Sequence, residues 1–189
     1  MSPKTLRRAG RSGFTLIELL IVVIILAILA AIVIPQFSSS TADAKEAALD
    51  ANLASMRNAI ELYKVQHTNN IFPGAVASSG GAGACTGGTK GTGALNTAPA
   101  FTDSMLMYSD AAGQTCTLSD ATDYKFGPYL RKAIPSDAIT GSTAIVVTST
   151  GAPIAPAAAT GGWAYDTKSG QIVMNSNATD SKGAAYSTH

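Results

Sequence analysis

The chain has 189 residues, enough for one modest domain, and charged side chains make up only 13% of it. Its 13 Lys and Arg nearly balance its 12 Asp and Glu, which gives a formal net charge of +1. Nucleic-acid binding is therefore not expected as a main activity, because that role needs a surplus of positive charge gathered on one surface.

Residues 1–13 form a short basic leader, and an apolar run follows directly. The leader contains no acid and four basic residues, namely Lys4, Arg7, Arg8 and Arg11. Residues 19–34 contain no polar side chain, and at about 1.5 Å per helical residue the stretch 14–34 spans roughly 30 Å. That length matches the hydrocarbon core of a bilayer, so we expect a membrane-spanning helix with the leader on its cytoplasmic side.

Two residues near the start of the run do not fit an ordinary secretory signal. Such a signal places small residues after its apolar core, where it is cleaved, whereas the distinctive small residue here is Gly13, which comes before the core. Glu18 is an acid within the apolar stretch. Because a carboxylate is costly to place in hydrocarbon, Glu18 indicates a functional residue with a partner.

Residues 13–20 read Gly-Phe-Thr-Leu-Ile-Glu-Leu-Leu, and Pro35 is the 22nd residue after Gly13. This pattern resembles the type III signal peptide of prepilins, the precursors in the type IV pilin and type II secretion pseudopilin family. The resemblance covers residues 1–65. It implies that a prepilin peptidase cleaves between Gly13 and Phe14, that Phe14 becomes an N-methylated N-terminus, and that its helix enters a filament.

Cleavage at this point would create a new charge close to Glu18. It removes the four leader charges and leaves an ammonium group on Phe14, one helical turn from the carboxylate. Opposite charges attract strongly in an apolar medium, where each alone is costly to bury. The ammonium group could pair with Glu18 of a neighbouring subunit and fix the register of assembly, or with Glu18 of its own chain. A plain anchor helix with a tolerated acid is the simpler alternative, but it leaves Gly13, the leader and Pro35 unexplained.

Beyond Pro35 the sequence is amphipathic rather than uniformly apolar. Apolar residues recur at spacings of 4, 3, 4 and 3, which predicts a helical stripe packed on the chain's own sheet: Leu49, Leu53, Met56, Ile60 and Tyr63. Pro35 lacks an amide hydrogen, so a kink is expected there. The Asn-Asn and Pro-Gly pairs at 69–70 and 73–74 disfavour further helix. We therefore expect one helix in two parts, residues 14–35 and 36–70.

Cys85 and Cys116 would lie on the exported side of the membrane. An even pair in an oxidising compartment predicts a disulfide, which here would close a loop of about 30 residues and stabilise the fold by roughly 3 to 4 kcal/mol. Many type IV pilins place their disulfide around a C-terminal loop, so this mid-chain pair departs from the family pattern. The glycine-rich residues 78–94 are expected to form a flexible loop, since their order breaks the phosphate-binding motif.

Residues 71–189 are predicted to form a globular head with short strands. The strand candidates are residues 144–148, 162–166 and 171–175, the last two joined through residues 167–170 as a hairpin with a glycine-containing turn. Residues 124–134 are expected to form a short helical turn or an extended segment. Together these elements predict an α+β, pilin-like fold, in which the long N-terminal helix packs on a small antiparallel C-terminal sheet.

Residues 127–141 and 161–166 resemble the C-terminal region of pseudopilins, some of which carry a calcium site in their loops. Asp137 and Asp166 are weak candidates for its ligands. Calcium needs several oxygen atoms that converge, and isolated acids in solvated turns are the simpler interpretation. No other metal or cofactor is expected.

The sequence favours a structural role: a subunit held in the bacterial inner membrane by one span, which polymerises with identical subunits into an extracellular or periplasmic filament. By resemblance, its partners are prepilin peptidase and a pilus assembly machinery. One alternative is the major pseudopilin of a type II secretion system, which drives protein export. Another is a pilin with an added adhesion or DNA-uptake role, through aromatic residues such as Trp163 and Tyr165. An enzyme is not expected, because His67 on the long helix and the distant His189 offer no Ser/His/Asp constellation.

Overall fold

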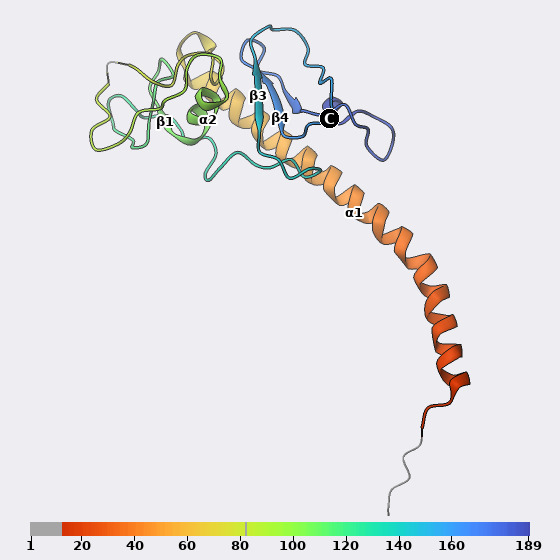
Figure 1. Cartoon of the computed structure of the whole chain (residues 1–189). Coiled ribbons are helices and arrows are strands. Elements are labelled where there is room, and N and C mark those ends of the chain that lie inside the picture. The colour runs from red at the N-terminus through yellow and green to blue at the C-terminus, as the bar shows by residue number, and fades with distance from the viewer. Residues whose placement is uncertain (1–12, 82) are drawn as a thin grey trace, which may run out of the picture. The chain divides into compact units, whose positions relative to one another are not determined.

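The computed structural model describes residues 13–81 and 83–189 and divides into two units, Met1–Ala42 and Asp43–His189. The predicted leader therefore lies outside the described residues, apart from Gly13. The long helix α1 (Leu16–Gln66, 51 residues) contributes to both units (Figure 1).

In the first unit, the apolar part of α1 makes no core of its own. Its large side chains are exposed along the whole run, from 42% for Val33 to 85% for Leu16. Among the described residues, α1 is the one helix that is long and apolar enough to cross a membrane. Pro35 lies inside the helix, which continues on both sides of it. A kink at Pro35 stays a prediction, because the helix is assigned without a break there.

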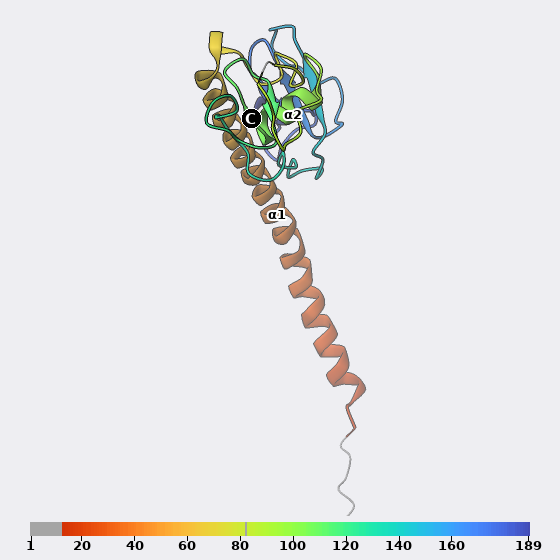
Figure 2. The ribbon, with the colours of Figure 1, turned by 90° about the vertical axis from the view of Figure 1, so that its left-hand side faces the viewer.

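In the second unit, the predicted stripe on α1 forms one side of the core. Its five apolar residues are at most 1% exposed, and they pack with residues of the C-terminal strands, including Trp163, Tyr165 and Ile172. Seen from the side in Figure 2, this part of α1 runs along one edge of the head. The helix ends at Gln66, four residues before the expected boundary at residue 70, and Asn69 and Asn70 then adopt left-handed backbone angles.

The C-terminal sheet has three strands in the order β3 (Ile145–Thr148), β4 (Trp163–Asp166) and β5 (Ile172–Met174). All three were expected to within one residue at either end, and β4 and β5 form the predicted antiparallel hairpin, with Trp163 opposite Met174. The expectation of a wholly antiparallel sheet was wrong, because β3 pairs with β4 in parallel. The reason is the connection 149–162, which returns the chain to the end where β3 began, as a parallel pair requires.

A second helix and two short strands of the head were not predicted. Helix α2 (Ala98–Leu106) begins after Thr97, whose side chain accepts a hydrogen bond from the Ala100 amide. Two-residue strands β1 (Tyr108–Ser109) and β2 (Thr115–Cys116) pair antiparallel. Residues 124–134 contain bends and one bridge, between Phe126 and Ser109, so the helical alternative expected for this segment is not formed.

The glycine-rich segment is tied to these elements. Cys85 is bonded to Cys116 of β2, with their Cα atoms 5.7 Å apart. The carboxylate of Asp103 on α2 accepts hydrogen bonds from the amides of Thr92 and Gly93, at 2.9 and 3.2 Å, and from the Ser78 hydroxyl at 2.6 Å. Both ends of the segment are therefore held against α2 and β2.

Loss of the disulfide should weaken the head measurably. In the chain-entropy model, a loop with the observed separation of 31 residues contributes roughly 3 to 4 kcal/mol. We expect Cys85→Ser to lower the free energy of unfolding by about that amount in denaturant titrations of the full chain in detergent, followed by Trp163 fluorescence. Treating the unmodified chain with a reductant is the matched control and should give the same shift. An unchanged midpoint in both experiments would show that the bond does not stabilise the fold.

Candidate functional site

The start of α1 is organised by a reciprocal pair of side chains. Thr15 immediately precedes the helix, and its carbonyl accepts the first helical hydrogen bond, from the Leu19 amide. One oxygen of Glu18, Oε2, accepts hydrogen bonds from the Thr15 amide at 2.8 Å and from the Thr15 hydroxyl at 2.7 Å. In return, Thr15 Oγ1 accepts from the Glu18 amide at 3.3 Å. This arrangement is a capping box, which satisfies amides that a helix start leaves unpaired.

The capping box is readable in the sequence as Thr-x-x-Glu, although it is absent from the sequence-based predictions. It gives Glu18 a task within its own chain before any cleavage. Within the described part of the chain, the hydrogen bonds of Glu18 use Oε2 and its amide, and Oε1 takes none. Since a carboxylate can accept about four hydrogen bonds, Oε1 is available to another donor.

The predicted cleavage point lies outside the helix. Residues 13–15 have no helical structure, and, its chain neighbours apart, no atom of the described residues lies within 4 Å of the position that a side chain at Gly13 would occupy. Phe14 is 82% exposed. A peptide bond outside regular structure, next to an exposed residue, is accessible to a peptidase, so the local structure is compatible with processing between Gly13 and Phe14.

A second surface runs along the head portion of α1, on the side opposite the buried stripe. Its seven exposed residues recur at spacings of 4, 3, 4, 3, 4 and 3, and five of them are Ala, Ser or Asn: Ala44, Ala48, Ala51, Ser55, Asn58, Leu62 and Val65. Leu62 and Val65 are large and apolar, and both are more than half exposed. Small side chains let a second backbone approach closely. We call this surface the open face of α1.

Asp137 and Asp166 serve the backbone rather than a common ligand. Asp137 accepts hydrogen bonds from the amides of Thr140, Ser142 and Gly162, at 2.6, 3.1 and 2.8 Å. Gly162 precedes β4 and Asp166 ends it, so the two carboxylates lie at opposite ends of a strand, about 13 Å apart at about 3.3 Å per residue. They do not converge.

Asp166 is held in the same way at its own end of the strand. Its carboxylate accepts from the amides of Thr150, Lys168 and Ser169, at 2.8, 2.9 and 2.8 Å. Burial would raise the pKa of both Asp137 and Asp166, but these hydrogen bonds outweigh it and hold each pKa below its ordinary value. Among the residues that the structure describes, no three His, Cys, Asp or Glu side chains are grouped to hold a metal ion. Calcium binding stays a sequence-based prediction.

His67 contacts a serine, but in surroundings that exclude a hydrolytic site. His67 is buried, with Nε2 2.9 Å from the Ser109 hydroxyl and Nδ1 against the Tyr63 carbonyl at 2.6 Å. This Ser–His contact was not expected, but Ser109 is fully buried, and burial lowers the pKa of His67. A nucleophile that no substrate can reach, next to a base that resists protonation, does not make a hydrolytic site.

One family model matches the N-terminal end of the chain, and several known proteins are similar to part of it. Residues 8–34 match the family model described as the prokaryotic N-terminal methylation motif. The type II secretion system core protein G of Pseudomonas aeruginosa is 40% identical over 62 residues, which cover 33% of this chain and 44% of that protein. The type IV narrow pilus major component PilA5 of Thermus thermophilus is 48% identical over 54 residues, 29% of this chain and 47% of that protein.

A third relative matches more residues of the chain. The type IV major fimbrial protein FimA of Dichelobacter nodosus is 40% identical over 86 residues, 44% of this chain and 55% of that protein. The chain thus spans about half the length of the curated relatives it matches. No solved structure matches it.

The matched region contains Gly13, Phe14 and the Thr15–Glu18 pair, followed by the exposed apolar run. The relatives described above include proteins named for pili and for type II secretion. The rest of the structure, a long helix with a small α+β head, is the predicted pilin-like architecture. In its N-terminal motif and its architecture the chain is similar to type IV pilins and type II secretion pseudopilins.

Proposed function

We propose that this chain is a structural subunit that polymerises through its N-terminal helix, from the bacterial inner membrane into a type IV pilus or a pilus-like filament. The observation that carries the proposal is the exposed apolar part of α1, whose large side chains contact no core of their own. An apolar surface of this size must be covered. A bilayer covers it before assembly, and neighbouring helices cover it afterwards.

Processing would prepare the helix for packing against neighbouring helices in the filament. Prepilin peptidase would remove residues 1–13, with their four positive charges, and Phe14 would carry the new, N-methylated ammonium group. Oε1 of Glu18 would then accept this group, while Oε2 stays with Thr15. If the ammonium group comes from the neighbouring subunit, the pair fixes the axial register of the filament and neither charge is left alone in an apolar core.

The open face of α1 offers a second contact between subunits. Its small residues would let an adjacent subunit's backbone approach closely, and Leu62 and Val65 would lose exposed apolar area in the same contact. The head's own core already covers the opposite stripe, so the helix has one side for its own fold and one for its neighbours.

The decisive experiment is to shear surface material from cells that express the chain and examine it by electron microscopy and mass spectrometry. We expect filaments built of a chain that begins at methylated Phe14. Filaments whose subunits retain residues 1–13 would overturn the processing step. A chain that is processed but stays in the membrane, with no filament of any length, would overturn the structural role.

Cleavage should depend on the small size of Gly13. We predict that Gly13→Val leaves the precursor uncleaved, because a stiff, branched side chain next to the scissile bond obstructs its binding to the peptidase. Mass spectrometry of the membrane fraction should then find residues 1–13 attached in nearly all copies. Ser12→Val, one residue further from the bond, is the control and should be processed. If both variants were cleaved to the same extent, the cleaved bond would not be the one between Gly13 and Phe14.

The alternative role is the major pseudopilin of a type II secretion system, and the relatives named core protein G are the observation that favours it. Deleting the gene would then abolish export of secreted proteins while surface filaments are absent in the parent strain. If the chain is a pilin, the parent strain carries surface filaments, and deleting the gene removes them without affecting export. An added adhesion or DNA-uptake role has no support from Trp163 and Tyr165, because both side chains are fully buried in the core.

A further inference from the structure

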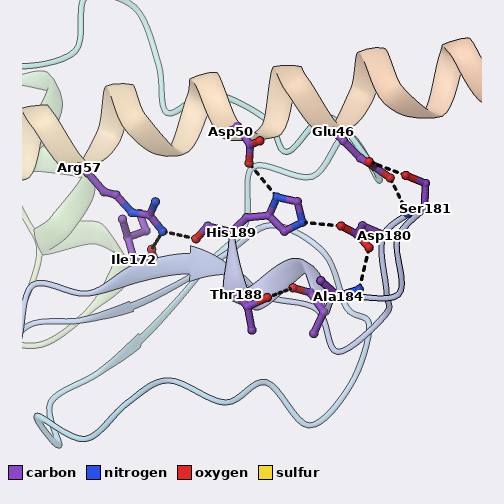
Figure 3. Close-up of polar contacts among 10 residues, drawn as sticks. Glu46, Asp50, Arg57, Ile172, Asp180, Ser181, Ala184, Thr188 and His189 are labelled. Atoms are coloured by element: carbon purple, nitrogen blue, oxygen red, sulfur yellow. Dashed lines mark hydrogen bonds and ion pairs between the residues drawn. The ribbon is translucent and has the colours of Figure 1, made fainter.

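The last segment of the chain, residues 176–189, is fastened to the side of α1 by polar contacts (Figure 3). We call this segment the strap. It meets α1 at Glu46, Asp50 and Arg57, which span about 16 Å of helix at about 1.5 Å per residue. All of these residues belong to the second unit.

The two outer contacts are fixed hydrogen bonds. Glu46 accepts from the Ser181 amide at 2.8 Å and from the Ser181 hydroxyl at 2.9 Å, and this cover leaves the acid only 8% exposed. Arg57 donates to the main-chain oxygens of His189 and Ile172, at 2.6 and 3.2 Å.

The central contact is different, because the His189 imidazole lies between two carboxylates. Nδ1 is 2.8 Å from Asp50 on α1, and Nε2 is 3.4 Å from Asp180 on the strap itself. The side chains of His189 and Asp180 are 14% and 6% exposed, and Nε2 makes no hydrogen bond with the described residues. A neutral imidazole has one N–H and can serve one of these acids, whereas an imidazolium can donate to both.

The other groups around the imidazole do not replace its charge. The Tyr186 ring lies 5.8 Å away, and Arg57, the nearby cation, contacts the His189 main chain. Asp180 is also held by the amides of Lys182 and Ala184, at 2.9 and 2.7 Å. Burial would raise the pKa of Asp180, but these amides and the His189 charge lower it, so Asp180 stays a carboxylate.

From this geometry we infer that the strap is a proton-controlled latch on α1, closed while the His189 imidazole is charged and released when it loses its proton. Release leaves a lone pair facing one of the two carboxylates, and the strap then retains the outer contacts alone. Rising pH therefore frees Asp50 from His189 and loosens the middle of the strap, while the core from Leu49 onward still holds the helix.

Hydrogen exchange of the full chain in detergent micelles tests the latch directly. Peptides that cover residues 178–188 are compared at about pH 5.5 and about pH 8, after correction for intrinsic rates, with an internal reference from α1 residues 53–63. We expect the strap amides to lose about tenfold in protection at the higher pH, while the protection of the reference peptide stays unchanged. A tenfold change is what a one-unit difference in proton affinity between the closed and the released strap produces. Equal strap protection at both pH values overturns the inference.

Variants identify the responsible group. His189→Gln should exchange at the faster rate at both pH values, since it can donate to one carboxylate only. Asp50→Asn should reduce the pH response, whereas Glu61→Gln, which alters an exposed acid of α1 paired with Lys64, should keep it. A pH response that persists in His189→Gln, or that appears equally in the reference peptide, would assign it to His67 and overturn the latch. Since the unmodified chain gives the primary result, a variant that fails to fold does not weaken the test.

Discussion

Replacing Glu18 with Ala should abolish filaments while leaving the subunit processed and inserted in the membrane. The carboxylate is the partner of the Phe14 ammonium group in the proposed assembly, and without it that charge would enter an apolar core alone. Insertion should survive, because the variant helix is more apolar than the original. We expect the sheared filament fraction to fall to less than about one tenth, with a normal N-terminal mass for the membrane-bound subunit.

The capping box allows the two tasks of Glu18 to be separated. Thr15→Ala removes the hydroxyl that binds Oε2 but leaves the carboxylate and the Phe14 amine in place. If Glu18 acts mainly by pairing with the amine, Thr15→Ala should still assemble, with reduced yield because the carboxylate is less well positioned. If Glu18 acts only as a helix cap, both variants should behave alike. Normal filaments from Glu18→Ala would rule out the register argument.

Features that depend on local pattern could be predicted from the sequence. The stripe from Leu49 to Tyr63 and the β4–β5 hairpin repeat at the periods of a helix and a strand, so the residues themselves indicate which side is buried. The cleavage segment is equally local. The exposure of the apolar run in the first unit follows from its uniform composition, which offers no polar face.

Features that depend on the path of the chain could not be predicted. The parallel pairing of β3 with β4 is decided by where residues 149–162 lead, and β1 and β2 are too short to carry a pattern. Helix α2 did leave a signal, Thr97 followed by Pro99, which is typical of a helix start. That signal is weak within a Gly- and Ala-rich stretch.

The site residues also divide into those whose contacts are local in sequence and those whose contacts depend on the folded chain. Thr15 and Glu18 are three residues apart, so their pairing is readable from sequence alone. Asp137 and Asp166 gave an ambiguous signal, because a sequence does not show which way backbone amides point. The structure directs those amides at both carboxylates. His189 and Asp50 are 139 residues apart, and only the folded chain brings them together.

Asp166 should be among the most costly acids of the head to change. It is fully buried, and its carboxylate receives amide hydrogen bonds from two loops, one before β4 and one after it. Asp166→Asn keeps the shape but turns an N–H₂ group toward donors that then lack an acceptor. Each buried amide left unpaired costs roughly 1 to 3 kcal/mol, so we expect a loss of about 3 kcal/mol or more in the free energy of unfolding.

The pH dependence of the same measurement tests the cause. Because folding lowers the pKa of Asp166, its contribution is present above the unfolded value of about 4 and is lost as pH falls toward the folded value. Urea unfolding of the full chain in detergent at about pH 7 and about pH 3 should therefore show a smaller decline for Asp166→Asn than for the unmodified chain. Asp43→Asn, at an exposed position of α1, should match the unmodified chain to within about 0.5 kcal/mol at both pH values. If Asp166→Asn were as stable as this control at neutral pH, the amides around Asp166 would have to find other acceptors, and the carboxylate would not organise the two loops.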